Sequence, residues 1–187
     1  MITTPRLILR QWQENDRQHF AEMNADPEVM RYFPAPLTGE QSDKRLDEII
    51  AFMDKHGWGF WAVALQQTRE FIGCVGLNKK PANSGYPQAP LVEIGWRIAR
   101  QHWRQGYAYE SATACLDYAF NELGLDKVYA VTALVNTPSQ QLMKRLGMHN
   151  TYQDFDHPSI EKGHALARHC LYKIDCKTYQ NQHKEHP

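Results

Sequence analysis

The sequence predicts a mixed α+β domain in which helices flank a mostly antiparallel sheet. Three observations lead to this prediction. Several short runs are rich in β-branched and aromatic residues, as strands are. Other segments repeat apolar residues at intervals of three and four, as amphipathic helices do. The early strands follow one another through short turns or loops, whereas the later strands alternate with helices, which favours a layered sheet-and-helix architecture.

The N-terminal half is predicted to form a strand, two helices and a three-stranded meander. Residues 6–10 alternate as a strand does, and residues 15–23 indicate a short helix. Thr38-Gly39-Glu40-Gln41 has the spacing of a capping box, which predicts a helix that runs as far as Gly57. The meander comprises strands at residues 58–65, 70–77 and 91–99, with a proline-rich loop over residues 78–90.

The C-terminal half alternates helices and strands. Residues 106–123 place apolar side chains at helical spacing, and Gly124 stands where a C-cap glycine belongs. A second helix is predicted to begin at Thr137-Pro138-Ser139-Gln140 and to close at Gly147. Strands are expected at residues 127–135, 148–155 and 169–174. We expect one domain over residues 1–178, followed by a frayed polar tail over residues 179–187.

Composition excludes several classes of function. The 187 residues carry 21 Lys and Arg against 21 Asp and Glu, so no global positive field would gather nucleic acid or anionic lipid. No apolar run is long enough to cross a membrane, and the N-terminus lacks the pattern of a secretory signal. The four cysteines form no C-x-x-C pair and the nine histidines show no metal-ligand spacing. We therefore expect a cytoplasmic protein without a bound metal.

The stretch from residue 93 to residue 112 runs from a strand through a basic turn into a helix. Between Gly95 and Arg104 it holds three arginines and a histidine but no acidic residue. Gly106 and Ala108 are small residues in the first helical turn, where free backbone N–H groups and the helix dipole favour an anion. This pattern fits a pyrophosphate site, although a solvated basic face at an ordinary helix start would look the same.

Six short motifs occur along nearly the whole chain in a specific order and spacing. They are Thr4-Pro5-Arg6-Leu7-Ile8-Leu9-Arg10, Phe71-Ile72-Gly73-Cys74-Val75-Gly76-Leu77, Val92-Glu93-Ile94-Gly95-Trp96, His102-Trp103-Arg104-Gln105-Gly106-Tyr107-Ala108, Asn136-Thr137-Pro138-Ser139 and Leu146-Gly147-Met148. In these motifs the chain resembles the GNAT acyltransferase superfamily, most closely its branch of RimJ/RimL-type ribosomal-protein N-acetyltransferases.

The resemblance implies a central twisted sheet that splays between its fourth and fifth strands, here residues 91–99 and 127–135. It also implies that acetyl-CoA is the co-substrate. Its pantetheine arm would pair with the main chain of the fourth strand as an added strand does. Its pyrophosphate would bind the backbone amides of the following turn. The residues concerned are Trp96, Arg97 and Ile98 on the strand, and Arg104, Gln105, Gly106, Tyr107 and Ala108 in the turn.

Three further polar residues receive roles from the same resemblance. Glu93 is implied to be the general base, directly or through water, Asn136 to bind the pantetheine portion, and Ser139 to protonate the departing thiolate. A main-chain N–H near Ile98 would meet the oxyanion. The residue pattern alone leaves alternatives, because Glu93 could face solvent and the pair Asn136 and Ser139 could simply cap a helix. Gly95 fits either a bulge or close packing.

Aromatic residues flank the predicted central strands. They could line a pocket for the acceptor or belong to the core, and for Phe60 and Trp61 we expect the core. The full set is Tyr32, Phe33, Trp58, Phe60, Trp61 and Tyr86.

The predicted function is an N-acetyltransferase that moves the acetyl group of acetyl-CoA to a primary amine. The acceptor is a protein N-terminal α-amine or a small-molecule amine, and transfer is direct, in a ternary complex, since no cysteine lies in the motif turn. The alternative is a non-catalytic CoA-binding or protein-interaction module with the same fold. The expected partner is the amine acceptor, without nucleic acid or membrane, and the chain is expected to be a monomer or a homodimer.

Overall fold

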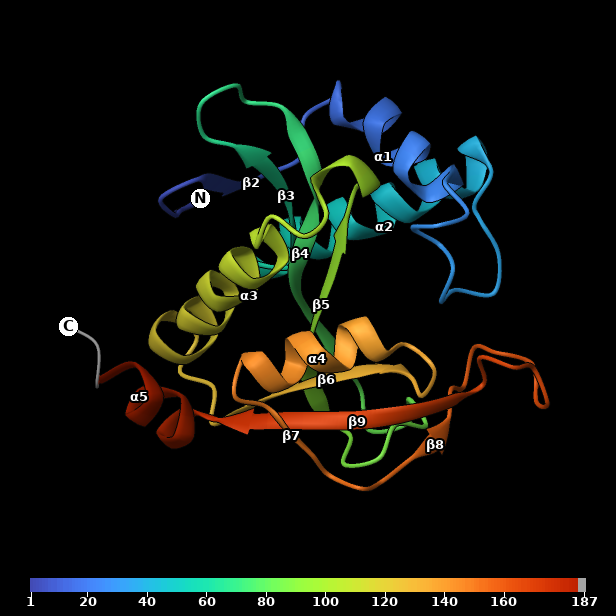
Figure 1. Cartoon of the computed structure of the whole chain (residues 1–187), viewed down its shortest axis with the longest axis vertical. Helices are drawn as coiled ribbons and strands as arrows, with labels where there is room; N and C mark the ends of the chain where they lie inside the picture. The colour runs from blue at the N-terminus through green and yellow to red at the C-terminus, as the bar shows by residue number, and fades with distance from the viewer. Residues whose placement is uncertain (185–187) are drawn as a thin grey trace. The chain divides into compact units, whose positions relative to one another are not determined.

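The computed structural model describes residues 1–184, and these form two compact units (Figure 1). The first unit comprises residues 1–77 and 95–114, and the second comprises residues 78–94 and the chain from residue 115 onward. Three elements contribute residues to both units: the strands β4 (Phe71–Lys80) and β5 (Leu91–Ile98), and the helix α3 (Tyr107–Asp117). No described helix is both long enough and apolar enough to cross a membrane.

The first unit is built on antiparallel pairs in the order β1-β2-β3-β4. Two helices lie side by side against this sheet, and an apolar cluster joins them to it through Phe20, Leu46, Ala62 and Phe71 (Figure 1). The elements are β1 (Ile2–Thr3), β2 (Leu7–Arg10), α1 (Asp16–Ala25), α2 (Gly39–His56), β3 (Phe60–Leu65) and the short 3₁₀ turn η1 (Arg100–His102).

The structure confirms the predicted capping box at the start of α2. The Thr38 hydroxyl accepts a hydrogen bond from the Gln41 backbone N–H, and the Gln41 side chain accepts one from the Thr38 N–H. Gly57 ends the helix in the left-handed conformation with φ 74°, which glycine adopts without steric cost. The helix therefore begins and ends where the sequence predicts.

The second unit centres on the antiparallel pair of β6 and β9, which runs from Lys127 opposite Asp175 to Ala133 opposite His169. The strand β5 pairs with β6 in parallel, with Glu93 opposite Tyr129. Helix α4 lies over β6, and α5 follows β9 (Figure 1). The elements are a π-helical turn η2 (Tyr118–Glu122), β6 (Lys127–Ala133), α4 (Thr137–Arg145), β7 (His149–Asn150), β8 (Phe155–Asp156), β9 (Arg168–Asp175) and α5 (Cys176–Lys184).

The predicted fold class is confirmed, because helices accompany a mostly antiparallel sheet that contains one parallel pair. The pairing of β5 with β6 at the single register of Glu93 and Tyr129 agrees with the expected splay of these two strands. The predicted helix over residues 106–123 is α3 continued by the π-helical turn η2, in which the Leu123 N–H reaches the Tyr118 carbonyl.

Three element boundaries were predicted wrongly. The strand β4 continues to Lys80, into the segment expected to be a loop. The strand expected over residues 148–155 is two short strands, β7 and β8, separated by a turn in which Tyr152 has a φ of 57°. The segment expected to be a frayed tail forms α5 as far as Lys184, anchored by the buried Tyr179, whose hydroxyl donates to Asp117. Residues 185–187 of that segment lie outside the described residues.

Candidate functional site

The predicted pyrophosphate turn connects β5 to α3 within the first unit. Arg104 and Gly106 both have positive φ, at 59° and 83°. This backbone conformation turns the chain sharply before α3 begins at Tyr107. The side chain of Trp103 folds back along the strand, and its Nε1–H donates to the Ile98 carbonyl at 2.6 Å. This contact fixes the turn without using the backbone N–H groups of residues 104–108.

The backbone amides of residues 104–108 donate no hydrogen bond to any other group among residues 1–184. The first amides of a helix have no intrahelical acceptor, and α3 begins at Tyr107, within this run of amides. Neighbouring amides are engaged, because Trp103 N–H donates to Arg100 and Glu110 N–H to Gly106. The turn therefore presents consecutive free N–H donors at the positive end of a helix dipole, the arrangement that binds phosphate groups.

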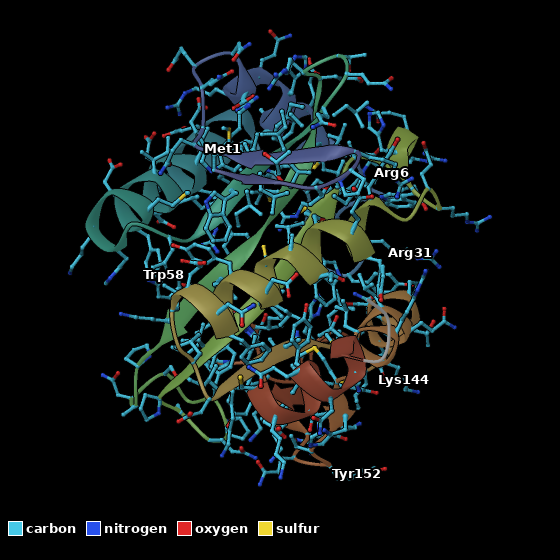
Figure 2. All side chains as sticks on the ribbon, turned by 90° about the vertical axis from the view of Figure 1, so that its left-hand side faces the viewer. Met1, Arg6, Arg31, Trp58, Lys144 and Tyr152 are labelled. Atoms are coloured by element: carbon cyan, nitrogen blue, oxygen red, sulfur yellow. The ribbon has the colours of Figure 1, made fainter. Side chains whose placement is uncertain are left out.

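An ion pair between the N-terminal segment and α3 braces this turn. Arg6, which directly precedes β2, is labelled in Figure 2. Its Nε–H donates to the Glu110 carboxylate at 2.6 Å, and its Nη1–H donates to the Gln105 carbonyl at 2.9 Å. The Arg6 guanidinium also lies over the Tyr107 ring, 4.7 Å from its centroid. One arginine therefore contacts the turn at a carbonyl, at a ring and through the helix that the turn opens.

The Glu110 carboxylate is held in its ionised form. Burial alone would raise its pKa, but hydrogen bonds from the Thr4 hydroxyl, the Arg6 N–H and the Arg6 side chain together hold the pKa of Glu110 below its ordinary value. The brace is therefore intact at neutral pH. It weakens only when acid protonates this carboxylate.

The C-terminal half of β5 carries the residues predicted to pair with pantetheine. Gly95 lies against the Phe60 ring, and a Cβ on Gly95 would stand 2.8 Å from it, which favours the close-packing interpretation of this glycine. Trp96 is partly buried and Ile98 is buried. The Arg97 side chain turns toward the helical layer of the unit, where its Nη1–H donates to the Asn24 carbonyl oxygen.

Glu93, the predicted base, lies on the other half of β5 and belongs to the second unit. Its carboxylate accepts a contact from Lys80 Nζ at 3.1 Å, and both side chains are mostly buried, with 14% and 19% of their surfaces exposed. The interpretation of Glu93 as a plain solvent-facing residue is therefore disfavoured. Lys80 also lies over the Tyr86 ring at 4.8 Å, and Tyr86 hydrogen-bonds His157.

Asn136 and Ser139 stand at the start of α4 in the same unit. Asn136 is the N-cap, and its Oδ1 accepts the Ser139 backbone N–H at 3.2 Å. Its Nδ2–H donates to the Thr132 hydroxyl at 2.8 Å. The half-buried Ser139 hydroxyl makes no hydrogen bond to the described residues. Asn136 therefore caps the helix, while the Ser139 hydroxyl has no structural task within it.

Most aromatic residues considered for an acceptor pocket are structural. Trp61 and Trp58 are buried, and Phe60 packs against the apolar cluster of the first unit, as expected for the core. Tyr86 packs against Phe155 in the cluster of the second unit. Phe33 differs, because 38% of its surface is exposed and its ring contacts the Arg97 guanidinium.

Comparison with known proteins decides the family. A family model described as an acetyltransferase (GNAT) domain matches residues 6–149. The chain belongs to the GNAT acetyltransferase family. The N-acetyltransferase YnaD of Bacillus subtilis is 31% identical over 176 residues, which is 92% of this chain and 95% of YnaD. An acetyltransferase of the GNAT family from Bacillus anthracis has a structure of TM-score 0.77, 25% identical, covering 94% and 98% of the two chains.

A third protein of similar fold has a solved structure with coenzyme A bound. The spermidine N-acetyltransferase of Vibrio cholerae, in complex with CoA and spermine, has a TM-score of 0.74 at 20% identity and covers 95% of this chain and 100% of its own. At that identity the likeness concerns the fold. Family membership makes this protein an acetyl-CoA-dependent acyltransferase, and the unengaged turn of residues 104–108 fits the coenzyme's diphosphate.

The contribution of Arg6 and Glu110 was missed by sequence reasoning about the GNAT site. Arg6 stands in the first of the six motifs without a role of its own, and no sequence pattern singles out Glu110. The 104 residues that separate the two in sequence hide this partnership from local patterns.

Proposed function

We propose that this chain transfers the acetyl group of acetyl-CoA directly to a primary amine in a ternary complex. The observation that carries the proposal is the run of backbone amides at residues 104–108, which donate to no other described group. Consecutive N–H donors at a helix start, where the positive end of the helix dipole also lies, suit an anionic ligand such as a diphosphate.

The coenzyme contacts we propose use main chain more than side chain. Amides of Arg104, Gln105, Gly106, Tyr107 and Ala108 hold the diphosphate, and Gly106 lets it approach the backbone closely. The main chain of Trp96, Arg97 and Ile98 pairs with the pantetheine arm, while Asn136 contributes its side chain to the same arm. The strand and turn contacts are supported by the conformation of the first unit, in which the turn is braced but its amides are open.

Two side chains supply proton transfer in this proposal. The amine nitrogen forms a bond to the acetyl carbon while the carbon–sulfur bond breaks. Glu93 takes the amine proton, directly or through water, and the Ser139 hydroxyl gives a proton to the departing thiolate. A main-chain N–H near Ile98 meets the developing oxyanion. Lys80 Nζ lies 3.1 Å from the Glu93 carboxylate and is the charged group beside the proposed base.

Direct transfer is supported by the state of the cysteines. Cys74, Cys115 and Cys170 are buried, and burial raises the pKa of the Cys115 thiol far above its ordinary value. A thiol that stays protonated is a poor nucleophile. None of the four cysteines lies in the turn or on β5. An acyl-cysteine intermediate therefore has no suitable residue at the proposed site.

The acceptor is a protein N-terminal α-amine or a small-molecule amine. An α-amine with a pKa of about 7.7 to 8.0 costs little over ~1 kcal/mol to deprotonate at pH 7, whereas a lysine costs roughly 4 to 5 kcal/mol. A weakly basic amine thus demands less of Glu93. The RimJ/RimL-like motifs favour a protein N-terminus, and the spermine bound to the Vibrio cholerae relative favours a small amine.

The test is to incubate the protein with acetyl-CoA and a panel of amines while free thiol is followed. We expect thiol release that depends on both substrates and rises with the neutral fraction of the amine. CoA binding without thiol release across a broad panel, beside a working control enzyme, would instead establish a non-catalytic CoA-binding module.

The role of Glu93 has its own test. We expect Glu93→Gln to flatten the acid limb of the pH profile of kcat/KM, because Gln cannot accept the amine proton. Lys80→Met serves as the matched variant, since it removes the partner and keeps the carboxylate. A Glu93→Gln profile that retains the wild-type acid limb would assign the base elsewhere.

A further inference from the structure

The guanidinium cation of Arg97 lies inside the first unit without a carboxylate partner among the described residues. Its side chain is partly buried, its Nε atom is fully buried, and that atom has no hydrogen-bond partner. One N–H donates to Asn24, and the guanidinium lies 4.3 Å from the centre of the Phe33 ring. No Asp or Glu among residues 1–184 forms an ion pair with it. Most of the five N–H donors of this guanidinium are therefore unused.

The surroundings of Arg97 are built rather than accidental. Asn24 is completely buried on α1, and its Nδ2–H donates to the buried Ser42 hydroxyl at 2.8 Å, so its oxygen is fixed toward Arg97. The exposed Phe33 covers one face of the guanidinium. Both neighbours are neutral. They orient the arginine and leave its charge uncompensated.

The local charge balance favours an anion at this position. Burial lowers the pKa of Arg97, the nearby Cys74 raises it, and the charge of Arg45 lowers it again. Arg45 lies at the surface, paired with Glu48 at 3.1 Å. A partly buried cation that has a second cation and no carboxylate nearby is unfavourable in the free protein. A ligand with a carboxylate relieves this cost, whereas a polyamine adds to it.

We propose that the acceptor is an amine that also carries a carboxylate, and that Arg97 binds this carboxylate beside Asn24 and Phe33. The inference rests on the proposed function, because it takes β5 as the strand along which acetyl transfer occurs. The two parts of Arg97 then have separate tasks. Its main chain pairs with the pantetheine arm, and its side chain selects the acceptor. The planar guanidinium suits a carboxylate because two parallel hydrogen bonds can form.

The experiment uses acids and amides that differ only in charge. N-acetylated amino acids and their C-terminal amides, which have no titratable amine, are tested as inhibitors of acetyl transfer to whichever amine is turned over. For the wild-type protein we expect each acid to inhibit at least tenfold more strongly than its amide. In Arg97→Gln this preference falls to within about twofold, while the dissociation constant of CoA stays within threefold.

Controls separate this inference from the proposed function and from folding. Arg69→Gln, at an exposed arginine of the same unit, keeps the wild-type preference. Arg97→Gln is expected to melt at or above the wild-type temperature, because it removes an uncompensated charge and can still donate to Asn24. Arg97→Lys keeps a reduced preference for acids, as its charge remains without the planar fork.

Three results would contradict the inference. Equal inhibition by acids and amides in a wild-type protein that turns amines over would overturn the choice of acceptor and leave the proposed function standing. A large loss of CoA affinity in Arg97→Gln with the acid preference intact would assign the side chain to the coenzyme. Absence of thiol release with every amine would overturn both proposals together.

Discussion

The starts of helices α3 and α4 meet the same physical demand in opposite ways. Each helix follows a strand and leaves its first backbone amides without intrahelical acceptors. At α4 the Asn136 side chain accepts the Ser139 N–H, so the helix start is capped by the chain's own side chain. At α3 no side chain of the described residues accepts an amide of residues 104–108. Instead, Arg6 stabilises the turn through a carbonyl and a ring.

A capped helix start stabilises the fold, whereas an open helix start keeps its backbone N–H groups available for a ligand. A capped helix start contributes about 1 kcal/mol to folding and has few donors to offer. An open start gives up that contribution, and an external brace such as the Arg6–Glu110 pair holds its shape without using the amides. In our proposal α3 therefore contributes main-chain donors to the site, whereas the start of α4 contributes only side chains, those of Asn136 and Ser139.

The largest expected effect concerns the Ser139 hydroxyl in the first turn of α4. Ser139→Ala should lower kcat by roughly a hundredfold if its hydroxyl is the acid, since general acids contribute about 10² to 10⁴ in rate. The CoA dissociation constant, measured by calorimetry, should change less than threefold. Equal losses in turnover and CoA affinity would make Ser139 a binding residue. No loss in either would exclude the Ser139 hydroxyl from the reaction.

The next effect lies in the turn before α3. Gly106→Val should raise the acetyl-CoA dissociation constant at least tenfold, because a side chain at φ 83° is strained and blocks close approach of the diphosphate. Gly124→Val is the matched control, since Gly124 has a φ of 62° and nothing within 4 Å of an added Cβ. A folded Gly106→Val protein that binds like wild type would remove the turn from the site.

A smaller effect is expected from the brace. Glu110→Gln should weaken acetyl-CoA binding about three- to tenfold, because the turn remains but is less well fixed. The carboxylate's contribution to stability is present above its ordinary pKa of 4.5 and is lost as pH falls through the lower pKa of the folded state. Melting temperatures between pH 3 and pH 6 should therefore fall less steeply with acid in the variant. Superimposable curves would show that the ion pair contributes nothing.

The smallest effect concerns the cap itself. Asn136→Ala should lower the free energy of unfolding by about 1 kcal/mol through loss of the N-cap, which urea denaturation can measure. Asn136→Asp, which keeps the acceptor oxygen, should recover most of this loss. If Asn136 also binds pantetheine, both variants should weaken CoA binding severalfold, and unchanged binding would leave capping as its sole task.

The features predicted correctly from the sequence are those that depend on interactions between residues close together in the chain. The capping box of α2, the helical spacing of α3 and the glycines that follow α2, η2 and α4 depend on residues a few positions apart, and they were predicted correctly. Failures occurred where distant contacts decide. Tyr179 anchors α5 because its ring packs against Phe120 and its hydroxyl donates to Asp117. The turn before β8 interrupts a run that reads as one strand.

The same division holds for the site. The sequence could indicate that residues 104–108 form an anion-binding turn, because small residues, basic residues and a helix start coincide there. It could not reveal that Arg6 supports this turn or that Arg97 contacts Asn24, since these pairs are separated by 99 and 73 residues. The proposed carboxylate preference therefore rests on contacts of the folded first unit, which the amino-acid order does not display.

The most direct test is an amide-resolved NMR titration of the isotope-labelled protein with CoA. Our account predicts large, saturable shifts for the backbone amides of residues 104–108, and small shifts for the amides at the capped start of α4. In Gly106→Val the shifts at the turn should saturate only at tenfold higher CoA. Saturable CoA binding that leaves the amides of residues 104–108 unshifted would contradict the account.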